Sequence, residues 1–157
     1  MSNAILLKQL GVDENSKPLP IKVKQQPEDK YYKAKFTPDF PPIPSFEPNL
    51  FIYASLVPGS VSVIGRHHTA DDFYQITIII DQKLESGTYP IEKGDESRVR
   101  ASVISAGGII SSDKGEIKLK RENIKESIYA EFDFQIESGG TSYKVEGRLE
   151  LRATGPL

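Results

Sequence analysis

The stretch SIYAEFDFQIESGGTSYKVEGRLEL, residues 127–151, decides the fold, because it holds two alternating runs on either side of a glycine pair. Successive side chains of a β-strand point to opposite faces of the sheet. The pattern therefore predicts a hairpin with one dry and one wet face, turning at Gly139-Gly140. The dry positions are Ile128, Ala130, Phe132, Phe134 and Ile136 on the first run, and Tyr143, Val145, Gly147, Leu149 and Leu151 on the second.

The two faces of the hairpin contribute different amounts to the stability of the fold. Burying one phenylalanine contributes roughly 1.5–3 kcal/mol, whereas a cross-strand pair on the wet face contributes a few tenths of a kcal/mol up to about 1. The dry face should therefore determine the structure. We interpret the hairpin as a core element rather than as a ligand surface.

Similar runs continue through residues 49–157, and they predict a single antiparallel β domain. The run YQITIII, residues 74–80, is apolar on both faces near its end, which predicts a central strand. We expect an all-β antiparallel β-sandwich, with a flattened eight-stranded β-barrel as the alternative. The expected strands are 50–56, 60–65, 73–82, 87–91, 98–105, 116–121, 127–137 and 142–152.

The first 48 residues differ in composition, since they contain eight of the 11 prolines. Proline lacks an amide hydrogen and restricts the residue before it, so this part cannot be a long helix or a central strand. We expect a proline-rich extended arm or strap, with at most one or two helical turns over residues 4–10 and a candidate short strand over residues 31–36. Phe40, Ile43 and Phe46 should pack on the body; a proline-rich partner motif is the alternative.

Charge and cysteine content argue against several classes of function. The net charge of -2 gives no basic footprint for nucleic acid and no attraction to an anionic membrane. The chain has no cysteine, hence no disulfide and no thiolate metal site. It shows no secretory signal pattern and no run of about 20 apolar residues, so a cytoplasmic location is the default expectation.

The polar cluster GRHHTADDFY, residues 65–74, contains both histidines. Imidazoles and carboxylates can bind zinc, so His67, His68, Asp71 and Asp72 are the metal candidates. Adjacent histidines on a strand point to opposite faces, however, and there is no third histidine. Thr69 and Asp72 fit a capping pattern instead. We therefore predict a solvated loop, with no metal, no cofactor and no catalytic residue.

The strings GTYPI, GEIKLKR and IYAEFDFQIESGGTSYKVEGRLEL resemble the terminal part of small uncharacterised bacterial β-proteins. In these a Gly-Thr-aromatic strand precedes a Gly-x-Ile-x-Ile strand and a final hairpin. The resemblance covers residues 87–151, and Arg148-Leu149 stands where an aromatic often follows the glycine. It implies a bacterial antiparallel β-sandwich and supplies no active site.

These observations favour a non-enzymatic β-sandwich that binds a protein or other macromolecular partner. The first alternative is a small-molecule carrier with an internal cavity, because an eight-stranded barrel can hold one small ligand. The chain lacks tryptophan, and thus the Gly-x-Trp signature of lipocalins, and Phe132, Phe134 and Tyr143 would fill a small barrel. The second alternative is an enzyme that uses the His67–Asp72 loop.

Overall fold

The computed structural model describes residues 3–40, 43, 46–94, 97–105 and 108–157, and the strands within them form two antiparallel sheets of five. Strand accounts for 58% and helix for 5% of the chain. We call the two layers the hairpin sheet and the covered sheet. The hairpin sheet has the order β1 (Tyr31–Thr37), β10 (Thr141–Arg152), β9 (Ser127–Ser138), β8 (Lys114–Glu122) and β5 (Gly87–Glu92). The covered sheet has the order β2 (Leu50–Ala54), β3 (Ser60–His68), β4 (Phe73–Asp81), β6 (Val99–Ser105) and β7 (Gly108–Ser111).

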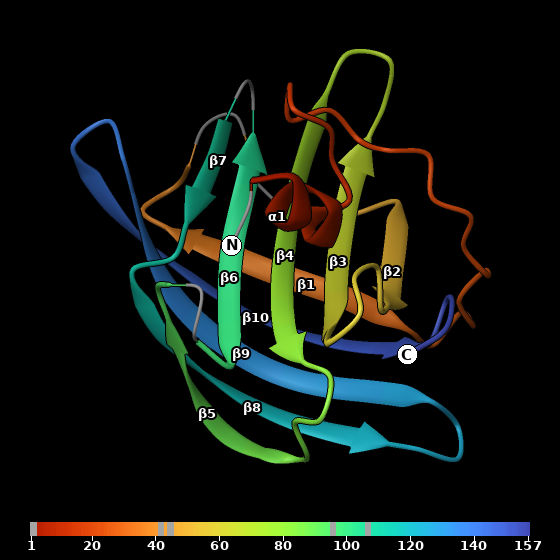
Figure 1. The fold of residues 1–157 in the computed structure, drawn as a ribbon. Coiled ribbons are helices and arrows are strands. Elements are labelled where there is room, and N and C mark those ends of the chain that lie inside the picture. Colours follow the sequence, from red (N-terminus) through yellow and green to blue (C-terminus); the bar gives the residue numbers. More distant parts are fainter. Residues whose placement is uncertain (1–2, 41–42, 44–45, 95–96, 106–107) are drawn as a thin grey trace.

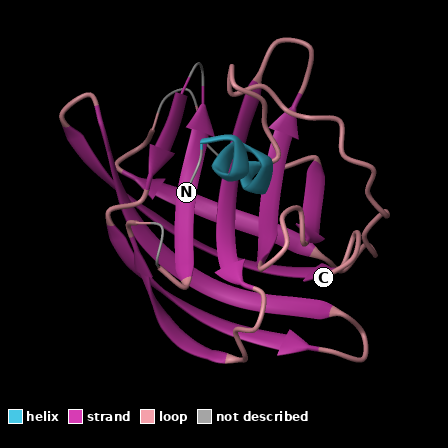
Figure 2. Cartoon of the chain, viewed as in Figure 1, coloured by secondary structure: helices cyan, strands magenta, loops and turns pink. Residues whose placement is uncertain are grey.

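The two sheets pack face to face, and their strands cross steeply (Figures 1 and 2). They do not close into a barrel. The predicted β-sandwich is confirmed, and the eight-stranded barrel is wrong. The space between the sheets is filled by one large cluster of buried apolar side chains drawn from both layers, including Tyr32, Tyr53, Ile78, Phe132 and Phe134.

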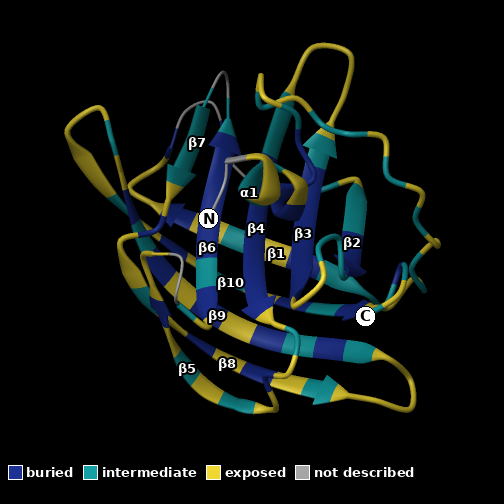
Figure 3. Ribbon diagram, in the orientation of Figure 1, coloured by how far each residue is buried: buried dark blue, intermediate teal, exposed yellow. Residues whose placement is uncertain are grey.

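The β9–β10 hairpin is confirmed residue by residue. Phe134 pairs with Val145, and Glu137 pairs with Ser142 beside the glycine turn. Buried and exposed residues alternate along β9 (Figure 3), so its dry face lies in the core and its wet face points outward. Gly139 and Gly140 have φ values of 58° and 81°, which glycine adopts at little cost.

Strand β4 is the central strand of the covered sheet, as YQITIII predicted. Ile76, Ile78 and Ile80 point into the main core. Ile79 points to the opposite face, where it packs with Leu10 of the helix α1 (Asn3–Leu10). Both faces of β4 are therefore covered.

Two parts of the covered sheet differ from the sequence-based strands. Strand β3 continues through His68, beyond its expected end at residue 65, so His67 and His68 lie on the strand instead of in the predicted loop and the turn is confined to Thr69–Asp72. Strand β7 was not predicted, because its four residues are only partly buried or exposed and show no alternation.

The arm contributes one full strand. β1 pairs with β10 along its length, from Tyr31 opposite Glu150 to Thr37 opposite Lys144. Phe40, Ile43 and Phe46 are buried in the main core, which confirms the packing expected of the strap. The prolines at 41, 42 and 44 lie outside the described residues, and the domain boundary near residue 48 stays a prediction.

The chain end lies beside β2. The Tyr53 amide donates a hydrogen bond to Thr154 Oγ1 (3.1 Å), and the Ser55 amide donates to the Pro156 carbonyl (2.7 Å). The Thr154 amide donates back to the Tyr53 carbonyl (2.9 Å). The side of β2 that faces away from β3 is thus paired with the C-terminal residues.

Candidate functional site

The His67–Asp72 segment forms a tight polar turn. The Asp72 amide donates to Thr69 Oγ1 (3.0 Å), and the Thr69 amide donates to the Asp72 carbonyl (2.9 Å). The bond to Thr69 Oγ1 is the one that the capping pattern predicted, but the Thr69 amide bonds to the main chain of Asp72 and not to its carboxylate, and the segment is the turn between β3 and β4, with no helical turn. Asp71 and Asp72 are exposed.

The two histidines point to opposite faces of β3. His67 stacks on Tyr74 with ring centroids 4.4 Å apart, while His68 meets Phe73 edge to face at 5.7 Å. Within the described ranges, no group of three His, Asp or Glu side chains could share a metal ion. The structure does not bring the four candidate ligands together.

The outer face of the covered sheet is occupied by the chain's own N-terminal segment. Figure 1 shows α1 lying across β4 and β3. Gly11, with φ 70°, ends this helix, where the amides of Gly11 and Val12 donate to the carbonyls of Lys8 and Leu7. Three carbonyls at the end of the helix then accept bonds from side chains of the sheet: Ser62 Oγ to Gln9 O (2.5 Å), Gln75 Nε2 to Leu10 O (2.7 Å) and Arg66 Nη2 to Gly11 O (2.9 Å).

Arg66 is the centre of this contact. Its side chain is buried and reaches the Leu19 carbonyl and Gln75 Oε1 as well as Gly11. Burial lowers the pKa of the Arg66 guanidinium to about 10. Since the carbonyl end of a helix carries partial negative charge, it favours a cation at this place. Arg66 therefore links the covered sheet to the arm through its hydrogen bonds to the carbonyls of Gly11 and Leu19.

The outer face of the hairpin sheet, in contrast, is open. It carries a broad, shallow hollow of about 660 Å³ over β1, β10, β9 and β8. Eight charged side chains line it, and all are exposed. We call this surface the charged face; it consists of Lys33, Lys35, Glu116, Lys118, Glu131, Asp133, Glu146 and Arg148.

Strand register sorts the charged face into two adjacent rows. The first row runs Lys33, Arg148, Glu131 and Lys118, with three cations and one anion. The second runs Lys35, Glu146, Asp133 and Glu116, with one cation and three anions. A net charge of +2 therefore lies beside a net charge of -2, and the face as a whole is neutral.

Tyrosines border the cationic row. The Lys33 ammonium and the Arg148 guanidinium lie 5.5 and 5.9 Å from the Tyr31 ring centroid. The Tyr129 hydroxyl donates to Glu131 Oε1 (2.6 Å), and this bond raises the pKa of the tyrosine. These contacts orient the charged groups across the open face.

Sequence patterns anticipated the wet face of the hairpin but not the buried polar contacts under the arm. Gln75 and Thr77 carried the available signal, since they are polar residues on a strand that is otherwise apolar on both faces. Such residues need partners when both faces are covered. Thr77 bonds to Gln75 itself, whereas Gln75 also donates to the Leu10 carbonyl of a remote segment, which no local pattern identifies.

The fold and its surfaces define an antiparallel β-sandwich with one covered and one open outer face. No family model matches the chain, and neither a curated protein nor a solved structure matches it. The resemblance of residues 87–151 to small bacterial β-proteins therefore stays a prediction. Among the described residues, no helix is long and apolar enough to cross a membrane.

Proposed function

We propose that this protein is a non-enzymatic binding module that recognises a protein partner through the charged face. The observation that carries the proposal is the difference between the two outer faces of the sandwich. One is covered by α1 and the arm, whereas the other is an open sheet with a hollow of about 660 Å³.

The charge pattern favours a protein over other macromolecules. A nucleic acid or an anionic membrane would need an excess of cations, whereas the eight charges sum to zero. The alternation of a cationic and an acidic row fits a partner surface with the opposite order of charges. Complementary patterns of this kind determine partner choice and accelerate association.

The two alternative functions have less support. For a carrier, the space between the sheets is occupied by the main apolar cluster. For an enzyme, His67 and His68 point apart and Asp71 and Asp72 remain in a solvated turn.

A pair of matched double variants tests the proposal. Lys33→Glu with Arg148→Glu reverses the cationic row, and Lys22→Glu with Lys24→Glu makes the same charge change on exposed arm residues. Proteins cross-linked to the wild-type chain in extracts of its source are identified, purified and titrated by calorimetry. The face variant should weaken the purified complex by about ten-fold or more, and the arm variant should leave it unchanged. Equal weakening by both variants, or no specific complex at all, would overturn the proposal.

A further inference from the structure

A hollow of about 490 Å³ lies at the end of the sandwich where the β4–β5 loop passes from the covered sheet to the hairpin sheet. The loop contributes Lys83, Glu85 and Ser86 to its lining, and the end of β8 and the turn after it contribute Arg121 and Asn123. None of the lining residues belongs to the charged face. The hollow is therefore separate from the surface of the proposed function.

Arg121 is half-buried and is held in place at this hollow by its own hydrogen bonds. Its Nε donates to the Tyr53 hydroxyl (3.1 Å), and its Nη1 donates to the carbonyls of Gln82 (3.0 Å) and Leu84 (2.8 Å). These bonds use three of the five N–H donors of a guanidinium. The two donors of Nη2 have no acceptor in the parts of the chain that the structure describes. Because the side chain is already ordered, binding through Nη2 costs little conformational entropy.

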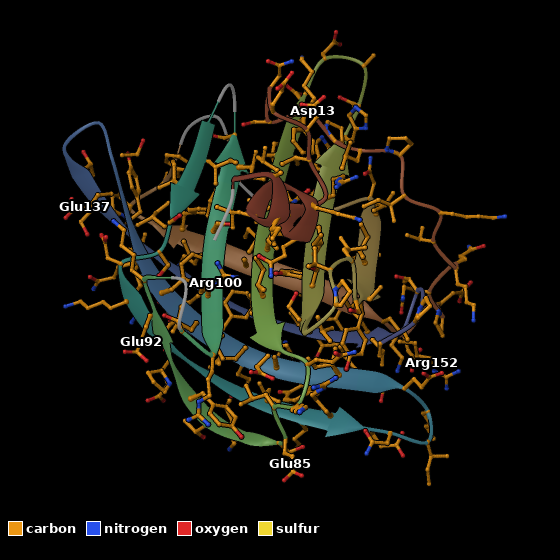
Figure 4. All side chains as sticks on the ribbon, in the orientation of Figure 1. Asp13, Glu85, Glu92, Arg100, Glu137 and Arg152 are labelled. Atoms are coloured by element: carbon orange, nitrogen blue, oxygen red, sulfur yellow. The ribbon has the colours of Figure 1, made fainter. Side chains whose placement is uncertain are left out.

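Two more donor groups line the hollow. The Lys83 ammonium and the Asn123 side-chain amide form no hydrogen bond or ion pair with any described residue, and both residues are exposed. Glu85 is the sole carboxylate among the described lining residues, and Figure 4 shows it projecting outward from the β4–β5 loop. No ion pair within the described ranges joins it to Arg121 or Lys83. The lining therefore has an excess of one positive charge and several donors that lack acceptors.

We propose that this hollow binds a phosphate monoester, whose oxygens accept hydrogen bonds from Arg121, Lys83 and Asn123. A phosphate monoester has three acceptor oxygens and a charge of about -1.5 to -2 near pH 7, which suits three donor groups better than a carboxylate does. Hydrogen bonds from arginine and lysine to phosphate are charge-assisted and therefore strong. The volume of the hollow, about 490 Å³, leaves room for the molecule that carries the phosphate.

Titration of the full chain with inorganic phosphate, followed by amide chemical shifts in nuclear magnetic resonance spectra, tests for the shared group. Phosphate should give saturable shifts at Ser86, Arg121 and Asn123, and sodium chloride at the same ionic strength should not. Glucose 6-phosphate and a phosphoserine peptide should shift the same amides, and the tighter of the two identifies the source of the phosphate. Glucose and the unphosphorylated peptide should not bind.

Three results of these titrations would refute the inference. The first is the lack of a saturable shift at these amides, and the second is a larger phosphate-dependent shift along the charged face. The third is binding of inorganic phosphate without binding of either organic phosphate, since the hollow would then hold an adventitious ion only.

Three variants locate the site while leaving Arg121 and its structural bonds in place. Lys83→Gln removes an exposed cation of the lining, so the Kd for inorganic phosphate should rise about three-fold or more at low ionic strength. Glu85→Gln removes the carboxylate and should lower that Kd. Lys120→Gln makes the same charge change as Lys83→Gln on an exposed residue of β8 outside the lining, and it should leave the Kd unchanged. Equal weakening by the two lysine variants would show attraction to net charge alone and would overturn the inference.

Discussion

Phe134 and Glu131 lie three residues apart on β9 and have opposite environments. Phe134 is fully buried, stacks near Phe132 at 5.9 Å and pairs with Val145, whereas Glu131 is exposed on the charged face. This contrast was predictable from alternation alone, because the period of a strand is two residues. The burial of Arg66 was not predictable in this way, since its partners come from the arm.

Phe134→Ala should lower the free energy of unfolding by about 3–5 kcal/mol, because it removes a ring from a close-packed core. Against a total stability of about 5–15 kcal/mol, this loss is severe. Glu131→Ala should change the free energy of unfolding by no more than about 0.5 kcal/mol. Urea denaturation of both variants checks the comparison, and a Phe134→Ala protein as stable as wild type would show that the dry face is not core.

The burial of Tyr32 predicts that the free energy of unfolding falls in alkali. Burial raises the pKa of this phenol, whose hydroxyl donates to the Ile76 carbonyl at 3.3 Å. The folded state therefore holds a proton that the unfolded state releases above about pH 10, so the stabilising contribution is complete below that pH and is lost as the pH rises. Tyr32→Phe should flatten the fall in stability above pH 10.

The measurement is the urea midpoint of both proteins at pH values from about 8 to 11. Arg66, with its lowered pKa, has the opposite dependence, but it is common to both proteins and cancels in the difference. If the difference between wild type and Tyr32→Phe were constant across this range, Tyr32 would not be buried as a neutral phenol.

At the level of elements, the arm is the part that the sequence described least completely. Helix α1 ends at Gly11 as expected. Its seat on the covered sheet depends on Ser62, Gln75 and Arg66, which lie more than 50 residues away along the chain. Strand β7 and the end of β3 were missed because short or half-covered strands lack a full alternating pattern. The seat of α1, strand β7 and the end of β3 depend on contacts between residues far apart in the sequence, which local periodicity does not reveal.

Arg66→Met should loosen the arm without unfolding the sandwich. The change leaves the carbonyls of Gly11 and Leu19 without their side-chain donor, at a cost of at least about 2 kcal/mol. The Leu19 amide, which donates to Gly11 O, should exchange its hydrogen faster than in the wild type. Lys17→Met, an exposed cation in the same segment, is the control and should leave exchange at Leu19 unchanged. Equal exchange in the Arg66 variant and the wild type would show that Arg66 does not hold the arm on the covered sheet.

At the scale of the whole molecule, the two outer faces of the sandwich differ, because α1 and the arm cover one and the other is open. The all-β class and the two-sheet architecture followed from strand patterns with turn residues between them. The charged face was only partly predictable. Alternation exposed its hairpin residues, but the two rows of opposite charge arise only when β1 and β8 are placed beside β10 and β9.

Far-UV circular dichroism should show a β-dominated spectrum with helix content near 5%. An average globular protein has about a third of its residues in helices. A helix content near that average would contradict the two-sheet fold and, with it, the placement of the charged face.

The pairing of β2 with the C-terminal residues has a consequence for self-association. A sheet margin with unpaired amides and carbonyls can template the addition of further chains. Here Thr154 and Pro156 occupy those groups along Tyr53 and Ser55. Chains cut before Thr154 would present this margin to one another and should aggregate on concentration. The residues Thr154 and Pro156 thus protect the β2 edge of the covered sheet against pairing with another chain.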